Sequence, residues 1–336
     1  MKKLLFTNVA YGPTYAEIFL NYHLKSFLDK SNIPAFKDRC EYVIFTDKET
    51  APSIQAHPLF HTLEANIPVH LVGIDWPKEI QGNAAKFNKR YGVLISTFRQ
   101  GVQMALEKDM LCSPMVADLV VAEDYVPKLF SRFEAGHDSV FVLPMRTAYE
   151  AMVPGLRLSL GALKSEQLFA LGYAALHPLW VACHWNSPQF TRLPFTLLWN
   201  NPGTGLLARS FSITPIAFQP TKEMAEAKQV IDVEIPALCT NPYWATDWVE
   251  CPVIGMEPLH CYYPPFKNSP ATEKDIAEWG VKSLHPSQFK WLEKSLYYPK
   301  LNGQWPHEQQ ASDFVVANIL AARSQLANDN VKAVGS

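Results

Sequence analysis

The chain has 336 residues, of which 48% are hydrophobic and 18% are charged, and its formal net charge is −2. This length suits one large α/β domain or two modest ones, because single cores stop growing near ~250–300 residues. The nearly neutral charge excludes the clustered positive surface of a duplex-binding protein, so we expect no nucleic-acid partner. The six cysteines show no metal-ligand spacing, which indicates reduced thiols and neither a zinc site nor a disulfide framework.

The first residues, M-K-K-L-L-F-T, carry a short apolar run between two lysines and Thr7. That run is too short for a secretory signal and far too short to span a bilayer. We therefore expect a cytoplasmic protein without a transmembrane segment. The helix expected over residues 312–326 is amphipathic but lacks a Lys/Arg-rich polar face. This favours docking on the core and leaves peripheral membrane contact as the alternative.

The first half of the chain alternates strand-like and helix-like segments, which is typical of a mostly parallel sheet covered by helices. Expected strands cover residues 3–9, 41–46, 69–74, the apolar run ending at Asp118, and 138–143. Expected helices cover residues 15–28, 53–65, 84–108 and 147–175, the last with a loop around Pro154 and Gly155.

Beyond residue 177 the sequence becomes dense in Pro, Trp, Asn and Gly, which indicates many loops. Two strands are expected here, over residues 195–199 and 213–218, followed by helices over 272–279, 286–296 and 312–326. Residues 329–336 are expected to form a disordered tail.

Candidate ligand-binding residues follow the ends of the expected strands, because ligands of open α/β sheets bind beyond the carboxyl ends of the strands. These residues are Ala10, Tyr11 and Gly12 after the first strand, Asp47 after the second, Asp75 after the third, and Asp118 after the fourth. Aromatic rings suit a nucleotide base and carboxylates suit ribose hydroxyls. Alternatively, Asp47 and Asp75 are ordinary turn formers.

Residues 115–130, M-V-A-D-L-V-V-A-E-D-Y-V-P-K-L-F, resemble a segment of GT-A-type glycosyltransferases. In that family an apolar strand ends in a D-x-D motif, continues into a second short strand and turns into a helix. The order of elements agrees over residues 3–145. The resemblance implies a GT-A-like, mostly parallel mixed sheet flanked by helices. It also implies a nucleotide-sugar-binding half, residues 1–145, and a loop-rich acceptor-binding and catalytic half, residues 146–328.

Two further stretches, S-F-L-D-K-S-N-I-P-A-F and G-T-G-L-L-A-R-S-F-S-I-T-P-I, are similar to a group of bacterial GT-A-like proteins associated with surface-polysaccharide genes. The implied partners are a UDP- or GDP-type nucleotide sugar and a glycan or lipid-linked acceptor.

The motif departs from the family pattern, because Val116 stands where the first acid of D-x-D belongs. The resemblance implies that Asp118 binds Mg²⁺ or Mn²⁺ together with the diphosphate, with His260 as a further ligand. In a metal-independent enzyme, Lys or Arg supplies the positive charge instead. The candidate cations are Lys86, Arg90, Arg146 and Arg209, and their neighbours favour Lys86 and Arg209.

An inverting transferase needs a base for the acceptor hydroxyl, whereas a retaining enzyme does not need one at that position. Asp247 is the first candidate, because Trp244 and Trp248 would partly desolvate its carboxylate and raise its pKa. Asp232 is the second candidate, and Glu234 and Glu250 are further acids in this half. The alternative is that Asp247 caps a turn while the tryptophans pack in the core.

Together with the candidate residues, the resemblance implies a glycosyltransferase of the hexosyltransferase type that acts in bacterial surface-polysaccharide synthesis. A sugar nucleotidyltransferase is less favoured, because N-V-A-Y-G-P-T-Y after the first strand holds no cation. A non-catalytic GT-A-like binding or assembly protein is the other alternative, and the single acid of the motif supports it. The donor sugar, the acceptor, the stereochemical outcome and the oligomeric state stay open.

Overall fold

A computed structural model describes residues 2–75, 83–191, 195–201, 204–227, 231–259, 266–299 and 305–334. Its centre is a seven-stranded sheet in the order β12-β6-β11-β4-β1-β2-β3. The strands are β1 (Leu4–Val9), β2 (Cys40–Thr46), β3 (Val69–Gly73), β4 (Leu111–Val116), β6 (Ser139–Val142), β11 (Thr214–Phe218) and β12 (Pro242–Trp244). Only β11 runs antiparallel to its neighbours. The expected mostly parallel, mixed α/β sheet is confirmed.

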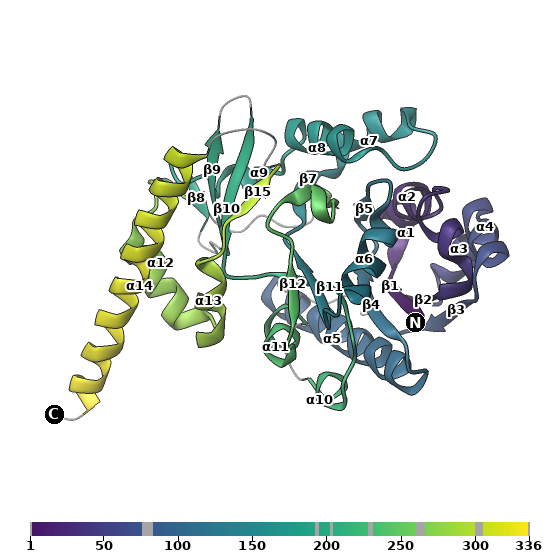
Figure 1. Ribbon diagram of the computed structural model, residues 1–336, viewed down its shortest axis with the longest axis horizontal. Coiled ribbons are helices and arrows are strands. Elements are labelled where there is room, and N and C mark those ends of the chain that lie inside the picture. The colour runs from purple at the N-terminus through teal and green to yellow at the C-terminus, as the bar shows by residue number, and fades with distance from the viewer. Residues whose placement is uncertain are drawn as a thin grey trace.

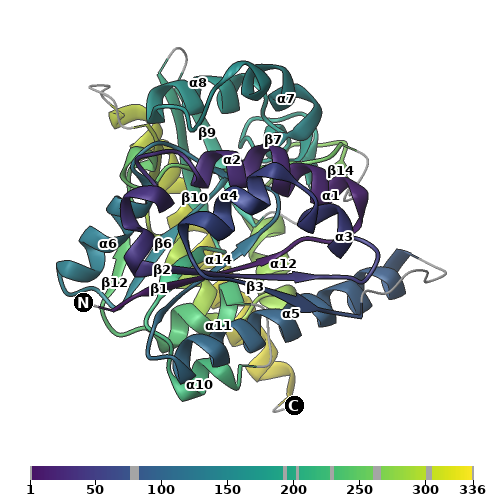
Figure 2. The ribbon, with the colours of Figure 1, turned by 90° about the vertical axis from the view of Figure 1, so that its right-hand side faces the viewer.

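Helices cover both faces of this sheet, as Figure 2 shows. One face carries α1 (Gly12–Ile18), the π-helical turn η1 (Phe19–His23), α2 (Leu24–Phe27), η2 (Ile33–Arg39), α3 (Ala51–Gln55), α4 (Pro58–Asn66) and α6 (Tyr125–Glu134). The other carries α5 (Asn83–Glu107), α10 (Lys222–Ala225) and α11 (Ile231–Leu238). Successive residues of β1 therefore enter opposite cores: Phe6 packs under the first set of helices and Leu5 under the second.

Several helices differ in detail from the sequence expectation. The helix expected over residues 15–28 begins earlier, at Gly12, with Pro13 in its first turn. The helix expected over residues 53–65 is divided into α3 and α4, because Pro58 begins a new helix after the extended His57.

A second, three-stranded sheet lies next to the central one, with the order β5-β13-β7. It consists of β5 (Leu119–Val121), β13 (Val253–Glu257) and β7 (Met145–Ala148). Two helices follow, α7 (Tyr149–Leu158) and α8 (Ser165–Ala174). The loop expected at Pro154 and Gly155 is wrong, because α7 runs through both residues. The break falls after it, where Gly161 passes so close to Asp29 that a Cβ would lie 2.5 Å from the carboxylate.

The C-terminal unit is built around a third sheet, β15-β10-β9, at the left of Figure 1. Its strands are β9 (Thr196–Asn201), β10 (Gly205–Ser210) and β15 (Leu296–Tyr298), and the two-stranded β8 (Phe190–Thr191) and β14 (Phe266–Lys267) lie beside it. The helical elements are α9 (Pro178–Val181), η3 (Trp248–Glu250), α12 (Glu273–Ser283), η4 (Pro286–Gln288), α13 (Phe289–Leu292) and α14 (Pro306–Val334).

This unit contains most of the strands that the sequence pattern did not predict. One of these strands lies in the run G-T-G-L-L-A-R, whose second glycine begins the fully buried strand β10. Gly205 is required there, because a Cβ would lie 1.9 Å from the Tyr298 carbonyl oxygen of the neighbouring strand. The helix expected over residues 286–296 ends at Leu292.

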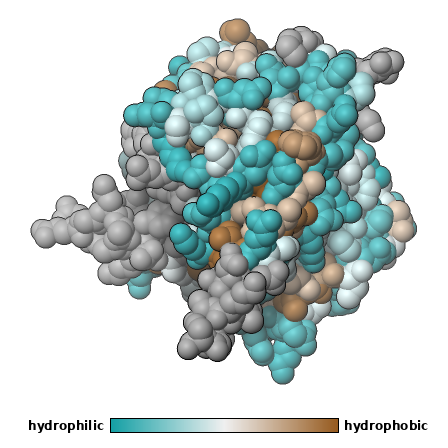
Figure 3. Space-filling view, turned by 90° about the vertical axis from the view of Figure 1, so that its left-hand side faces the viewer, coloured by the Kyte–Doolittle hydropathy of each residue, from teal (hydrophilic) through white to brown (hydrophobic). Residues whose placement is uncertain are grey.

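The two expected halves of the chain share one sheet, since β11 and β12 come from beyond residue 145. The tail expected to be disordered is helical as far as Val334, because α14 continues without interruption and each added helical residue contributes one backbone hydrogen bond. Among the described residues, no helix is both long and apolar enough to cross a membrane. The face in Figure 3 shows hydrophobic residues interspersed among hydrophilic ones.

Candidate functional site

The ends of β1, β2, β3 and β4 lie level with one another, because their registers pair Val9 with Phe45 and Val116, and Thr46 with Gly73. We call this side of the central sheet the carboxyl edge. The expected ligand-binding residues that follow these strands therefore share this edge. They are Ala10, Tyr11, Gly12, Asp47, Asp75 and Asp118.

The turn after β1 is fixed by Asp47. Gly12 has φ +65°, which an L side chain rarely adopts, and its N–H donates to Asp47 Oδ2 at 3.2 Å and to Thr50 Oγ1 at 2.8 Å. Asp47 Oδ1 accepts the N–H groups of Glu49 and Thr50 at 3.0 and 2.9 Å. Asp47 thus acts as a turn former that shapes the edge. Beside it, the Tyr11 and Tyr15 rings lie with centroids 5.1 Å apart, which presents flat aromatic surface.

Asp118 lies in the turn between β4 and β5, where it meets the second sheet. Its carbonyl accepts the Met256 N–H at 2.8 Å, so β13 holds the turn in place. On the neighbouring strand β7, Arg146 Nη1 contacts Glu257 Oε2 at 3.1 Å. Burial and then the negative charge of Glu257 raise the pKa of Asp118 to about 7, while the charge of Arg146 opposes this shift.

Asp232 adds a second perturbed carboxyl group. It lies in the first turn of α11 and hydrogen-bonds to Ser212, which precedes β11. Because β11 is antiparallel, its first residue lies at the carboxyl edge. Burial raises the pKa of Asp232 to about 6, and the charge of Arg146 again opposes the shift. We call Asp118, Arg146, Asp232 and Glu257 the Arg146 cluster.

His177 borders this cluster. Its backbone N–H donates to the Arg146 carbonyl at 3.1 Å, and its ring is buried. Burial lowers the pKa of His177, while the negative charge of Glu257 raises it. Sequence reasoning ranked Arg146 below other cations and missed Glu257, because β13 was not predicted. The alternation V-I-G-M-E is the signal that could have found this strand.

Lys86 and Arg90 belong to the beginning of α5, and their side chains lie outside the described residues. The helix starts at the carboxyl edge, because it leads from the end of β3 to the beginning of β4. The expected roles of Lys86 and Arg90 therefore stay predictions. His260 also lies outside the described residues.

The structure does not support the expected role of Arg209 as a ligand-binding cation. Its side chain is 2% exposed, and the guanidinium donates to Ser312 Oγ, the Glu293 carbonyl at 2.7 Å and the Asp313 carboxylate. It joins β10 to α14 and to the end of α13 and is not accessible to a ligand. The expectation failed because Arg209 itself lies in the buried strand β10.

The expected environment of Asp247 is also wrong. Its Oδ1 accepts the Val249 N–H at 3.2 Å and caps η3. The Trp248 indole is buried and donates to the Val253 carbonyl, while Trp244 stacks on Trp291 with centroids 5.2 Å apart. The two indole rings therefore do not enclose the Asp247 carboxylate. This agrees with the alternative that Asp247 caps a turn. Of the other acids, Glu250 accepts the Thr246 N–H at 3.0 Å.

No protein-family model matches the chain, and no curated protein does. Solved structures resemble it at low identity. A protein described as a glucose-1-phosphate thymidylyltransferase from Bacillus anthracis, in complex with sucrose, is 11% identical, with a TM-score of 0.25 over 44% of this chain and 57% of that one. Mouse xyloside xylosyltransferase 1 is 12% identical, with a TM-score of 0.27 over 46% of this chain and 57% of that one.

A mannosyltransferase from Pyrobaculum calidifontis, in complex with GDP-mannose and Mn²⁺, is 13% identical. It matches with a TM-score of 0.38 over 99% of this chain and 79% of that one. The matched regions span little more than half of the first two chains. At these scores the likenesses assign no activity to this chain.

Proposed function

We propose that the protein is a glycosyltransferase that takes a sugar from a nucleotide-diphosphate donor of the UDP or GDP type. The observation that supports it best is the carboxyl edge, where Tyr11 and Asp118 follow neighbouring strands and the Arg146 cluster adjoins them. Perturbed carboxyl groups beside a cation at such an edge are typical of functional sites. Synthesis of a bacterial surface polysaccharide, with a glycan or lipid-linked acceptor, belongs to this proposal.

The donor would lie along the carboxyl edge. The Tyr11 and Tyr15 rings would support the base, and the exposed carboxylate of Asp75 would accept ribose hydroxyls. Arg146, whose side chain is 55% exposed, would face the diphosphate and stabilise the charge that develops as this group leaves. Arg146 replaces Arg209 in this role, because Arg209 is buried.

Asp232 is our candidate for the base of an inverting reaction. The acceptor hydroxyl would attack the anomeric carbon, its proton would pass to the Asp232 carboxylate, and the bond from that carbon to the diphosphate would break. A base with a pKa near 6 is ionised at neutral pH and still accepts a proton effectively. Asp232 takes precedence over Asp247, which caps a turn.

The described residues contain no group of three His, Cys, Asp or Glu that could bind a metal ion. Asp118 and Glu257 are only two carboxylates, and Glu257 is paired with Arg146. This set does not complete a Mg²⁺ or Mn²⁺ site, and we derive no step through a metal. The proposal that Asp118 and His260 bind a divalent cation is tested by adding Mn²⁺.

A thermal-shift screen tests the proposed function. UDP-, GDP-, CDP- and CMP-sugars, including GDP-mannose, are added with and without Mn²⁺, because a ligand of the native state raises the melting temperature by mass action. We expect a shift with one class of donor that Asp118→Asn abolishes and the exposed control Asp124→Asn retains. The absence of a shift with every donor would contradict the proposal.

Turnover distinguishes an enzyme from a binding protein. An active transferase releases the nucleoside diphosphate from the bound donor, slowly to water and faster to an acceptor. Donor binding without any release would instead favour the non-catalytic alternative, to which the single acid of the V-A-D motif points.

A further inference from the structure

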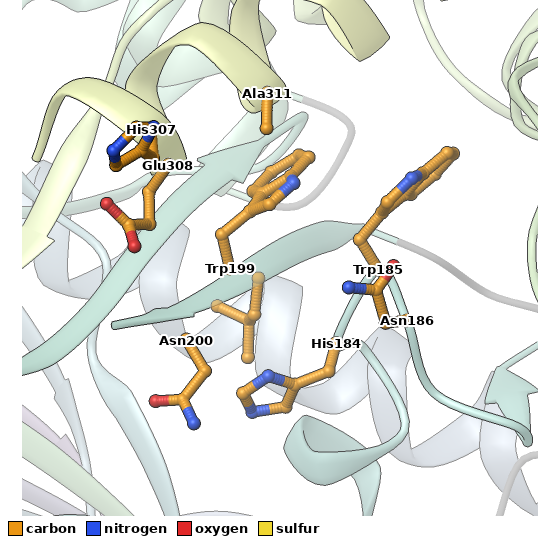
Figure 4. A pocket seen from close by; sticks show the side chains of 9 residues that line it. His184, Trp185, Asn186, Trp199, Asn200, His307, Glu308 and Ala311 are labelled. Atoms are coloured by element: carbon orange, nitrogen blue, oxygen red, sulfur yellow. The ribbon is translucent and has the colours of Figure 1, made fainter. Parts of the chain in front are cut away.

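A second candidate site lies in the C-terminal unit. A pocket of about 280 Å³ opens between the segment after α9, strand β9 and the beginning of α14. Figure 4 shows Trp199 in the middle, between His307 and Glu308 on one side and Trp185 on the other, with His184 and Asn200 below. Its volume is close to the lower end of small-ligand sites, ~300 Å³.

The two indoles form the apolar part of the pocket. Their centroids are 6.1 Å apart and their planes differ by 22°, so the rings contact each other. A ligand ring would therefore lie against their exposed faces and edges and not between them. Trp199 is 7% exposed and held in the core, whereas Trp185 is partly exposed. Indole surfaces of this kind suit ligands that have both apolar C–H faces and polar edges.

Polar side chains around the indoles have unused hydrogen-bond donors and acceptors. Within the described part of the chain, the side chains of Asn186, His307 and Glu308 make no hydrogen bond, and Asn200 uses only its Oδ1, which accepts from Tyr173 at 2.7 Å. Burial lowers the pKa of His184, so this imidazole is neutral at pH 7 and both donates and accepts.

The charge of the pocket narrows the class of ligand. None of its described lining residues is Lys or Arg, and Glu308 contributes a carboxylate. Among these described residues, phosphate, nucleotides and acidic sugars would meet a negative charge without a permanent cation to balance it. A ring with apolar faces and several hydroxyl groups would contact the indoles and hydrogen-bond to the Asn186 amide and to Asn200 Nδ2.

We propose that this pocket binds a neutral saccharide ring at a site separate from the donor edge. It adjoins the Arg146 cluster through α9, since His177 borders the cluster, His184 lines the pocket, and the charge of Arg146 acts on the thiol of Cys183. The pocket would thus hold part of the acceptor glycan, an assignment that rests on the proposed function.

Direct binding tests this inference without any transfer assay. The full chain is titrated with methyl glycosides of glucose, galactose, mannose and N-acetylglucosamine, and with the corresponding disaccharides, by NMR and tryptophan fluorescence. We expect saturable binding of at least one of them, with a Kd of about 0.1–5 mM, which is ordinary for a small polar ligand in a shallow site.

Variants locate the binding. Asn186→Ala and Glu308→Gln should each weaken it at least about fivefold, because the first removes an amide and the second replaces a charged acceptor, whose hydrogen bonds to hydroxyl groups are stronger, with a neutral amide. Glu166→Gln is the matched control, since Glu166 also lies in the first turn of a helix and is exposed, and it should bind as the unmodified chain does. Trp185→Ala should abolish binding. If this variant does not fold, the measurements on Asn186→Ala and Glu308→Gln still test the inference.

Two outcomes would overturn the inference: no saturable binding of any saccharide up to about 20 mM, a range that includes weak sites, or binding that is equal in Asn186→Ala and Glu308→Gln. Asp118→Asn separates this inference from the proposed function. It should lose the donor shift and keep saccharide binding. If the protein binds saccharide but no nucleotide-sugar donor, the saccharide site is supported and the proposed transferase function is contradicted.

Discussion

Two arginines in this molecule have opposite environments. Arg209 is buried and its guanidinium is held by a hydroxyl, a carbonyl and a carboxylate. Arg146 is largely exposed and adjoins three carboxyl groups, two of which have a raised pKa. The charge and the N–H donors of Arg209 are satisfied by its buried contacts. Around Arg146, by contrast, two carboxyl groups keep a raised pKa despite the nearby positive charge. We propose that the first arginine contributes to stability and that the second contributes to function.

The largest expected effect is that of Asp118→Asn at the Arg146 cluster. We expect transfer to fall by about 10³-fold or more, because this variant should also abolish the donor thermal shift and an enzyme that does not bind its donor cannot transfer the sugar. We also expect the free energy of unfolding at pH 8 to stay equal or to rise by about 1–2 kcal/mol, because the charged carboxylate is disfavoured in the folded state.

The sign follows from the raised pKa. The folded state binds this proton more tightly than the unfolded state, so the cost of the charge is present above pH 7. It is relieved as the pH falls from about 7 toward the ordinary value of 3.8. Chemical denaturation of both proteins at pH 5 and pH 8 measures the difference, which should be larger at pH 8. A clear loss of stability at pH 8 would mean that Asp118 is structural.

Asp232→Asn should reduce turnover by about 10²-fold, within the range for loss of a general base, and leave the donor thermal shift unchanged. In the unmodified protein, kcat/KM should rise with pH through about 6, as the carboxyl group loses its proton. The pH profile of the variant should lack this rise. A pH profile that is identical in both proteins would exclude Asp232 as the base.

Arg209→Met tests whether the buried arginine contributes to stability and not to donor binding. We expect a loss of about 2–4 kcal/mol in the free energy of unfolding, because three hydrogen-bonded contacts between β10, α13 and α14 are removed from a buried position. The donor thermal shift should not change. If donor binding is lost while the melting temperature is retained, Arg209 belongs to the site and the contrast between the two arginines fails.

Asp247→Ala is expected to have the smallest effect. Losing the cap of η3 should cost about 0.5–1 kcal/mol of stability. Turnover should stay within about twofold, since the Asp247 carboxylate caps η3 and Asp232 is the proposed base. A drop of 10²-fold or more in turnover, without loss of donor binding, would reinstate Asp247 as the base in place of Asp232.

The sequence predicted the first half of the fold well, because each strand there is a short apolar run and each long helix has a clear periodicity. It also predicted that Tyr11, Asp47 and Asp118 would share an edge, since parallel strands bring their ends together. It could not separate Arg146 from Arg209. What distinguishes them is burial and contacts to residues 84 to 111 positions away in the chain, which local patterns do not carry.

The return of the chain to the central sheet has a consequence for synthesis on the ribosome. Strands β4 and β6 are separated by β11, and β12 completes the outer edge. A nascent chain therefore exposes unpaired edges of β4 and β6 until residue 218 has emerged, roughly 4–15 s after residue 142 at ordinary elongation rates. Open edges of buried strands invite pairing between chains. We expect a chain terminated at residue 145 to aggregate, and the nascent protein to engage chaperones during that interval.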